Sequence, residues 1–336
     1  MMNYCYEVKG GLQRYDEVTF LKGMSITTIV IMHLIQNYMR YLPYGIKLLA
    51  SFGGTGVHVF FLCSGFGLYL SYLKRQTNYL DFLRKRFFKI YFPYIVIVII
   101  SFFVPLFYVN GNRLNALLSH VFLYKMFFPE FEETFGPFWF ISTLFQLYFL
   151  FIPLCGLKKK IGRVPFCLIC VLSSIVWWIF TSIAGINGNR IWGSFFLQYL
   201  WEFALGMLIA EYLYEGNDIK IPFWKLSIVC ILGLLLEGVM GIKGGWLKVF
   251  NDIPALFGYG TLGLLLYQCK MLRRLFIWIG SISYEWYLVH ILVFVLASTI
   301  NKNALIALMV LLCSIMVAYV YHRLIAIVST KLKSTL

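Results

Sequence analysis

The chain has 336 residues, of which 61% are hydrophobic and only 13% charged, and its formal net charge is +15. A soluble domain carries about a quarter of charged residues, so this composition excludes an ordinary soluble protein and indicates a chain that crosses a membrane several times. The positive charge alone does not indicate a nucleic-acid partner, because its distribution along the chain has to be considered first.

Apolar stretches of the length that crosses a bilayer, about 20 residues, recur along the whole chain. They predict an all-α polytopic integral membrane protein with about ten transmembrane helices in a single domain, residues 1–336. With a cytoplasmic N-terminus, the inner segments hold 21 of the 29 Lys and Arg, so both termini are expected in the cytoplasm. The ten expected spans are 20–39, 53–73, 90–109, 137–156, 164–184, 195–213, 224–241, 253–269, 277–298 and 303–327.

The charge distribution is thus a signal of topology. We expect a multi-pass protein of the plasma or inner cell membrane that contacts membrane lipids and binds no nucleic acid. The first nineteen residues lack the short apolar core of a cleaved signal, so the first span is expected to be retained. Cys167 and Cys170 have metal-ligand spacing, but no second ligand pair accompanies them, and we expect no metal site.

The first span carries a histidine, His33, well inside its apolar run. Lys22 lies eleven residues earlier, close to three helical turns, so the lysine and the imidazole share one helix face about 16 Å apart. Gln36 and Asn37 continue this polar stripe, and Arg40 ends the run. Such a stripe must face protein or water rather than lipid. His33 is either a packed, hydrogen-bonded residue or a functional one.

The second span opens with several glycines and then His58. Small residues in a membrane helix permit close approach of a neighbouring backbone. A basic cluster follows, in which Arg86 and Lys89 are three residues apart and therefore project together from the inner end of the third span. This pair either contacts lipid phosphates or binds a phosphorylated cosubstrate.

The long outer segment 110–137 contains an apolar portion too short to cross the membrane, and we expect it to be interfacial or re-entrant. The fourth span then places Trp139, Ser142 and Gln146 in its outer half. Trp139 can serve as an interfacial aromatic anchor. Ser142 and Gln146, one turn apart, can hydrogen-bond a neighbouring helix.

Ionisable residues also lie within later spans, namely Glu202, Glu237 and His290. Groups at such depth need partners or a water-filled cavity. His322 and Arg323 are near the inner end of the last span and are expected to be structural. Because the other polar residues fall in the middle or outer half of their spans, we expect one polar chamber open to the outside and a basic face on the inside.

Five stretches together resemble the integral-membrane acyltransferase type 3 family, whose members acylate surface polysaccharides and lipid-linked sugars. Lys22 and His33 resemble its Arg/Lys-x10-His pair, and Gly56 to Leu68 is similar to its glycine-led second helix. Arg86 to Tyr94 resembles its Arg-x-x-Arg-Ile-x-Pro element. The remaining matches are FWFISTLFQLYFLFIP from Phe138 and SYEWYLVH ending at His290.

The resemblance implies transfer of an acyl group, with acetyl expected, from cytosolic acyl-coenzyme A to a hydroxyl of a cell-surface polysaccharide or lipid-linked sugar. Acyl-coenzyme A would be a cosubstrate, with no permanently bound cofactor. His33 would be the essential catalytic residue, and Lys22, Arg86 and Lys89 would bind the donor. Support for the acceptor or the transition state is expected from His58, Trp139, Ser142, Gln146, Glu202 and His290.

A neutral imidazole is a suitable base for the acceptor hydroxyl near pH 7, but it can equally carry the acyl group as a transient nucleophile. Glu202 or His290 could orient His33, or simply hydrogen-bond between helices. The rival function is a glycolipid or oligosaccharide transporter or flippase, which typically has inverted repeats and broken helices. A non-catalytic component of polysaccharide assembly is a third reading, but it leaves the mid-membrane histidines unexplained.

Overall fold

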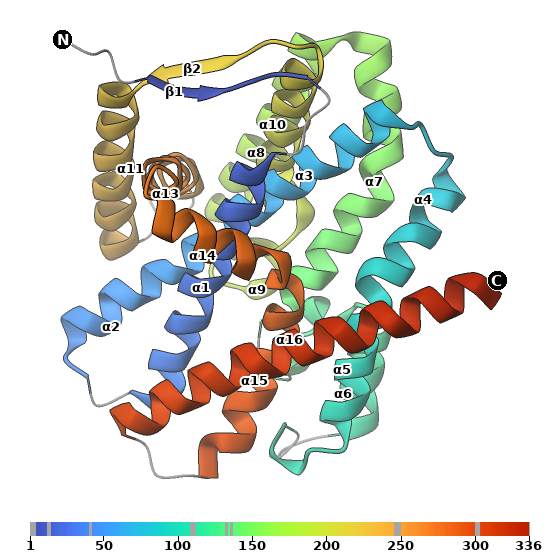
Figure 1. The fold of residues 1–336 in the computed structure, drawn as a ribbon, viewed down its shortest axis with the longest axis vertical. Coiled ribbons are helices and arrows are strands. Elements are labelled where there is room, and N and C mark those ends of the chain that lie inside the picture. The colour runs from blue at the N-terminus through green and yellow to red at the C-terminus, as the bar shows by residue number, and fades with distance from the viewer. Residues whose placement is uncertain are drawn as a thin grey trace. The chain divides into compact units, whose positions relative to one another are not determined.

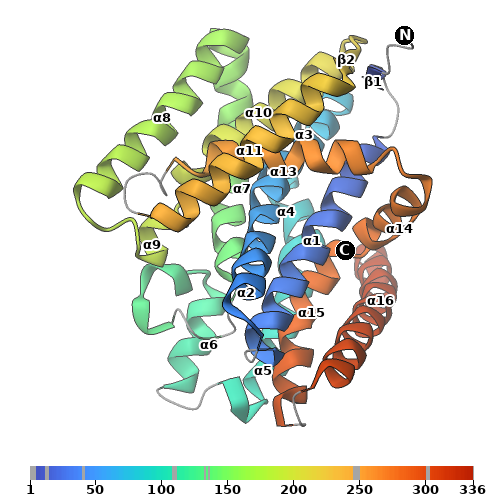
Figure 2. The ribbon, with the colours of Figure 1, turned by 90° about the vertical axis from the view of Figure 1, so that its left-hand side faces the viewer.

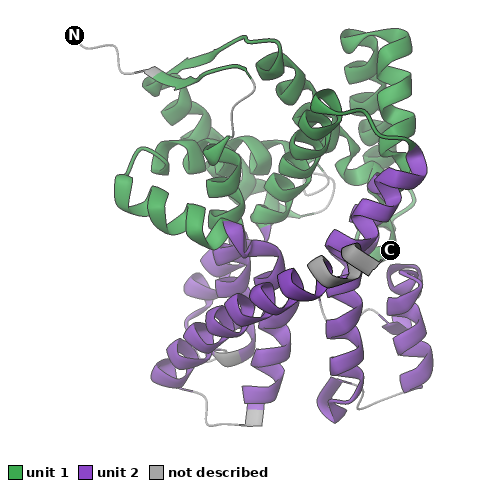
Figure 3. Ribbon diagram, turned by 45° about the vertical axis from the view of Figure 1, so that its right-hand side comes forward, with its two compact units in different colours: residues 1–25, 55–78, 149–280 green, residues 26–54, 79–148, 281–336 purple. Residues whose placement is uncertain are grey.

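The computed structural model of the protein describes residues 5–11, 15–39, 42–107, 112–131, 134, 137–244, 250–299 and 303–335. The described chain is predominantly helical, with one small antiparallel sheet, which agrees with the predicted all-α class (Figure 1). It forms two compact units, each assembled from three stretches of sequence (Figure 3). Unit 1 contains residues 1–25, 55–78 and 149–280, and unit 2 contains 26–54, 79–148 and 281–336. The single domain stays a prediction.

Unit 1 begins with β1 (Cys5–Val8), which pairs antiparallel with β2 (Ile219–Pro222) so that Tyr6 lies opposite Ile221. The remainder of the unit is helical. Its helices are the first part of α1 (Asp16–Tyr38), α3 (Gly56–Lys74), the later part of α7 (Trp139–Ile161), α8 (Arg163–Ile183), α9 (Arg190–Gly193), α10 (Phe196–Tyr214), α11 (Phe223–Lys243), α13 (Asp252–Leu266) and α14 (Lys270–Ser281).

Helices α3 and α10 pack backbone to backbone within unit 1 (Figures 1 and 2). A Cβ atom at Gly65 of α3 would collide with the carbonyl oxygen of Phe203, and one at Gly206 of α10 would collide with that of Leu62. Lipid tails are as apolar as the helix surfaces, so the hydrophobic effect does not drive membrane helices together. Small residues let the two backbones approach closely and so increase van der Waals contact between the helices. This contact brings the polar residues of α3 and α10 to the same place.

An aromatic core stabilises unit 1. Trp178 and Trp201 meet edge to face with ring centroids 6.2 Å apart, and Phe20 and Tyr259 are buried in the same cluster. Edge-to-face pairs add to the stabilisation that burial alone gives. Helix α11 packs on α13 beside this core. Four helices, α3, α10, α11 and α13, are thereby fixed in one unit.

Unit 2 contains the later part of α1, followed by α2 (Tyr44–Ser51) and a 3₁₀ turn, η1, that ends at Thr55 in unit 1. Among its helices, α15 packs against α16, and Trp286 donates a 2.9 Å hydrogen bond from Nε1 to the hydroxyl of Ser314. The other helical elements are α4 (Tyr79–Arg86), η2 (Phe87–Tyr91), α5 (Phe92–Phe102), η3 (Pro105–Phe107), α6 (Arg113–Val121), η4 (Lys125–Phe127), η5 (Pro129–Phe131), the start of α7, α15 (Ser283–Leu296), η6 (Ala297–Thr299) and α16 (Ala304–Thr335).

The segment η2 is a π-helical turn, in which the N–H of Phe92 bonds to the carbonyl of Phe87, five residues earlier. Pro93 follows immediately and lacks an N–H, which favours a departure from the regular α-helical ladder. Two tyrosines bond carbonyls of this region: Tyr284 donates to Ile90 at 2.6 Å, and Tyr321 donates to Pro93 at 2.6 Å. The distorted turn is therefore held by α15 and α16.

In the described part of the chain, seven helices are long and apolar enough to cross a membrane, or up to eight if the helices 270–281 and 283–296 form one broken span. The multi-pass architecture is thus confirmed. The helices in the expected spans 90–109 and 253–269 are shorter, since α5 has 11 residues and α13 has 15. The count of ten spans and the cytoplasmic termini stay predictions.

In the described residues after α5 and before α7, the helices are all short, namely η3, α6, η4 and η5, as expected for a stretch that does not cross the membrane. Arg40, Asn110, Glu132 and Glu133, which the sequence placed at or near the outer surface, lie outside the described residues.

Candidate functional site

A pair of histidines from opposite ends of the sequence meets in unit 2. His33 on α1 and His290 on α15 are 257 residues apart, and Nδ1 of His33 lies 3.0 Å from Nε2 of His290. The two rings are nearly parallel, with centroids 5.2 Å apart and an angle of 17° between their planes. His290 is fully buried, whereas His33 is partly exposed. Of these two residues, only His33 has exposed surface.

The partners of His290 define which nitrogens carry protons. Its Nδ1 lies 3.0 Å from the carbonyl oxygen of Trp286 and 2.8 Å from that of Tyr287. Carbonyl oxygens only accept hydrogen bonds, so Nδ1 of His290 carries a proton and, in the neutral ring, Nε2 is an acceptor. His33 must then donate through its own Nδ1. The lone pair of His33 is therefore on Nε2.

Two further contacts hold this pair in place. Asn37, one turn after His33, donates from its side-chain nitrogen to the carbonyl of His33 at 2.7 Å. The hydroxyl of Tyr287 donates to the carbonyl of Pro137, just before α7 begins. Asn37 belongs to the predicted polar stripe, but its side chain bonds the backbone carbonyl of His33 and not the imidazole.

A basic cavity of roughly 900 Å³ lies in unit 2 between α4, η2, the start of α15 and the end of α16. Arg86 and Lys89 both line it, so the structure brings together the two cations that the sequence paired. Arg84 and Lys85 add positive charge, and His322 contacts Glu285 across the wall with Nδ1 3.1 Å from the carboxylate. His322, expected to be structural, thus lines this cavity. Its position outside every motif gave no signal of this.

The other residues expected near the donor or the transition state are placed differently. Lys22 belongs to unit 1, on the first part of α1. Trp139, Ser142 and Gln146 occupy the first two turns of α7 in unit 2. The side-chain nitrogen of Gln146 lies 3.1 Å from the sulfur of Met126.

A polar cluster in unit 1 contains the other predicted residues. Nδ1 of His58 on α3 lies 2.7 Å from a carboxylate oxygen of Glu202 on α10. Nε2 of the same ring is 3.7 Å from Asp252, at the start of α13. Glu237 of α11 accepts a hydrogen bond from Thr55. The predicted polar residues thus fall into separate groups in the two units, and the single chamber stays a prediction.

Asp252 and its partner Gln198 were missed by sequence reasoning. Gln198 donates to the second carboxylate oxygen of Asp252 at 2.6 Å. Asp252 precedes an apolar run instead of interrupting one, so it does not stand out against an apolar background. Gln198 is one turn before Glu202, and this spacing was an available signal.

His120, on α6, has a structural role. Its ring nitrogens are each 3.1 Å from a hydroxyl, that of Tyr94 on one side and that of Thr134 on the other. Burial and the nearby charge of Lys125 hold the pKa of His120 well below its usual value, so the ring is neutral near pH 7. Because both nitrogens have hydrogen-bond partners, His120 is not a candidate base.

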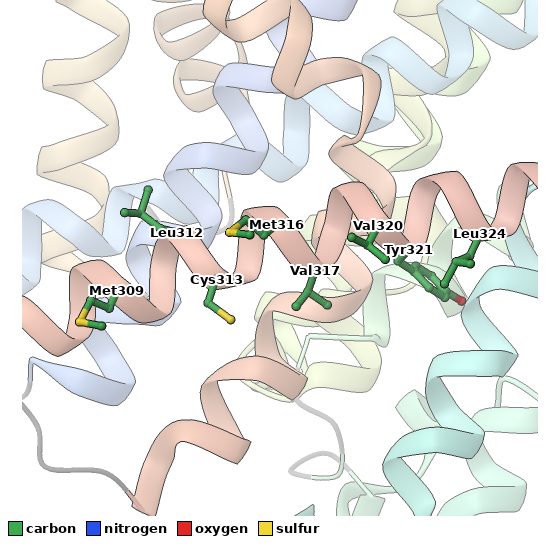
Figure 4. Close-up of a pocket in the computed structure, with 8 residues that line it drawn as sticks. All are labelled: Met309, Leu312, Cys313, Met316, Val317, Val320, Tyr321 and Leu324. Atoms are coloured by element: carbon green, nitrogen blue, oxygen red, sulfur yellow. The ribbon is translucent and has the colours of Figure 1, made fainter.

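An apolar hollow of roughly 600 Å³ lies along one face of α16, where Met309, Cys313, Val317, Val320 and Leu324 line it (Figure 4). It offers almost no polar surface for a reacting group. Its position on a long apolar helix suits lipid chains, and it is excluded as the site of chemistry.

Comparison with known proteins adds one decisive observation. Residues 15–323 match the sequence model of a family described as an acyltransferase domain. The chain belongs to the acyltransferase 3 family. No curated protein and no solved structure matches the chain. The resemblance inferred from the motifs is thereby confirmed, and the chain is a multi-pass membrane acyltransferase.

Proposed function

We propose that this acyltransferase moves an acyl group, with acetyl expected, from cytosolic acyl-coenzyme A to a hydroxyl of a cell-surface polysaccharide or lipid-linked sugar. The proposal places it in the plasma or inner membrane, with acyl-coenzyme A as a cosubstrate and no permanent cofactor. The observation that carries it is the hydrogen-bonded pair of His33 and His290, which leaves the lone pair of His33 on Nε2.

Acyl transfer from a thioester to an alcohol can use this lone pair in two ways. As a base, Nε2 of His33 takes the hydroxyl proton while the oxygen attacks the thioester carbonyl; the carbon–sulfur bond then breaks, and the thiolate receives that proton from the imidazolium. As a nucleophile, Nε2 itself bonds to the acyl carbon and releases the thiolate. The alcohol oxygen then takes the acyl group from nitrogen, the carbon–nitrogen bond breaks, and the hydroxyl proton passes to the thiolate. Both routes require the same tautomer.

His290 supports either route from behind the ring. A positive charge develops on His33 during transfer, and the acceptor nitrogen of His290 stabilises the Nδ1–H group that carries part of this charge. Because His290 is fully buried and bonded to two carbonyls of its own helix, it needs no reorientation during the reaction. It is a positioning residue, since it acts through His33.

The basic cavity supports binding of the donor. Coenzyme A carries several phosphate charges, and guanidinium and ammonium groups bind phosphate oxygens through charge-assisted hydrogen bonds. We assign the phosphates to Arg86 and Lys89, with Arg84, Lys85 and His322 on the same walls. The assignment of Lys22 to the donor rests on the family motif alone.

We assign support for the acceptor and the oxyanion from the position of each residue along its helix and from its hydrogen-bonding groups. Trp139, Ser142 and Gln146 offer hydrogen-bond donors at the start of α7. His58 and Glu202 offer polar groups to an acceptor sugar in unit 1.

The function is tested by incubating membranes that contain the protein with radiolabelled acetyl-coenzyme A and candidate glycans. The proposal predicts label in the glycan fraction, in proportion to the amount of protein. Transfer of a longer acyl chain would support the same class of reaction and show that the acyl group is not acetyl. Absence of transfer with every acyl-coenzyme A and glycan tested, while sugar crosses the membrane, would favour the transporter.

A further inference from the structure

The polar cluster of unit 1 contains a set of metal-ligating side chains separate from the histidine pair and the basic cavity. His58, Glu202 and Asp252 come from three helices, α3, α10 and α13. Each offers one ligand atom, and these atoms all lie within 4.8 Å of one another. Because three packed helices supply them, the ligands are held on regular structure instead of a flexible loop.

The spacing is close to that of a bound divalent ion. Zinc binds imidazole nitrogen and carboxylate oxygen at about 2.0–2.2 Å, so two of its ligands lie about 3–4 Å apart. In unit 1, Glu202 is 2.7 Å from one nitrogen of His58, and Asp252 is 3.7 Å from the other. An ion on one ring nitrogen requires one carboxylate to rotate, because Glu202 and Asp252 face different nitrogens of His58. The ligand atoms of all three residues lie within 4.8 Å of one another, which is the gap that this rotation has to close.

An unsatisfied oxygen points to a missing partner. Glu202 is fully buried, and while Oε1 bonds His58, its Oε2 has no hydrogen-bond partner among the described residues. A buried acceptor without a donor is costly. A protonated His58 between Glu202 and Asp252 would form a metal-free ion triad, but that triad leaves Oε2 of Glu202 unsatisfied.

The neighbouring groups are arranged as an outer shell. Gln198 donates to the other oxygen of Asp252 at 2.6 Å, which orients that carboxylate. Glu237, in the same polar cluster, accepts a hydrogen bond from Thr55. Ionised carboxylates are costly in an apolar unit, and a divalent cation between Glu202 and Asp252 would neutralise their charge.

We propose that His58, Glu202 and Asp252 bind a divalent transition-metal ion, with zinc the best match. An imidazole together with carboxylates favours zinc over calcium or magnesium, which prefer oxygen ligands alone. Three protein ligands leave one coordination position for water or substrate, as in zinc sites that perform chemistry. His58 and Glu202 also belong to the proposed support for the acceptor, but zinc binding can be measured without either substrate.

The test measures zinc directly, without an activity assay. The detergent-purified full chain is stripped with a chelator, incubated with Zn²⁺, separated from free metal and analysed by elemental mass spectrometry and titration. We expect about one zinc per chain. The variants His58→Ala, Glu202→Gln and Asp252→Asn are expected to weaken binding at least about 10-fold, the loss seen even for outer-shell changes.

Asp218→Asn is the matched control, because Asp218 is an exposed carboxylate of unit 1 that bonds the backbone of Gly10. It is expected to bind zinc like the unaltered chain. Elution as a single species checks that each variant is folded, and Glu202→Gln, the mildest change, keeps the test valid if another variant fails to fold.

X-ray absorption at the zinc edge supplies the second measurement, since the chain has eight cysteines that could bind zinc adventitiously. The proposal predicts a nitrogen and oxygen shell at about 2.0–2.1 Å. A shell containing sulfur at about 2.3 Å, affinity equal in all four variants, or no zinc retained would each overturn the proposal.

Discussion

His33 combines an exposed edge with a fixed partner, and both properties matter for its proposed role. Its Nδ1 donates a hydrogen bond to the buried Nε2 of His290, while the residue remains partly exposed. A histidine in which both nitrogens were bonded, as in His120, would have no lone pair to offer. The difference between these two residues comes from their tertiary partners, and nothing in the local sequence reveals it.

Sequence reasoning identified His33 and His290 separately, because a polar residue stands out in an apolar span. It could not pair them, because they are 257 residues apart in the sequence and meet only where α1 contacts α15 in unit 2. His322 was read as structural because a basic residue at a helix end usually extends to the interface. The cavity wall that it shares with Arg86 depends on three other elements.

Replacing His290 tests whether it positions His33. His290→Ala removes the acceptor for Nδ1–H, and we expect kcat to fall by about 10–100-fold, the usual effect of losing a partner that orients a functional side chain, while KM for acyl-coenzyme A changes little. His290→Gln places a carbonyl oxygen near the lost Nε2 and is expected to restore part of the rate.

Nitrogen-15 spectra of the histidine rings provide a readout that a merely structural role would not change. The chain has five histidines, so His33 can be assigned by comparison with variants. We expect protonated Nδ1 and unprotonated Nε2 in His33, with a mixture of tautomers in His290→Ala. The opposite tautomer in the unaltered chain would contradict the positioning role.

At the scale of elements, the π-helical turn η2 connects the basic cluster to α5. The motif Arg86 to Tyr94 was visible in the sequence, and so was Pro93, whose missing N–H favours an irregular turn. The bonds from Tyr284 and Tyr321 to its carbonyls were not visible, because they come from α15 and α16. The sequence thus predicted the charges of this element but not what holds it.

Removing the cations of the cavity is expected to weaken donor binding. In the double variant Arg86→Ala and Lys89→Ala, charge-assisted hydrogen bonds to phosphate are lost, and the Kd for coenzyme A should rise at least about 10-fold. Isothermal titration provides the measurement. Arg75→Ala is the control, since Arg75 belongs to the same basic region but is outside the cavity lining. Equal affinity of the double variant and the control would refute the donor assignment.

Close packing of α3 and α10 can be tested at two glycines of one helix. A methyl group at Gly65 would collide with the carbonyl of Phe203, whereas one at Gly67 meets nothing within 4 Å. We therefore expect Gly65→Ala to lower the free energy of unfolding by about 1–3 kcal/mol, and Gly67→Ala to be nearly neutral. Titration with a denaturing detergent measures both. Similar stability of the two variants would mean that these helices pack less closely than described.

For the whole molecule, hydropathy predicted a multi-pass helical protein and located most of its long helices correctly. It overestimated the lengths of α5 and α13, because apolar composition continues beyond the residues where the helices end. Nor could it predict the two units, which interleave three stretches of sequence each. Units built in this way depend on contacts between distant segments, and a single sequence does not specify them.

The central claim is that His33 performs the transfer, and the most direct measurement is label transfer from radiolabelled acetyl-coenzyme A by His33→Ala. The account predicts no transfer above the background of membranes without the protein, although the variant inserts and purifies normally. Ile31→Ala is the control, because Ile31 lies on the same helix and is 37% exposed; it should remain active. Transfer by His33→Ala at a rate near that of the unaltered chain would contradict the account.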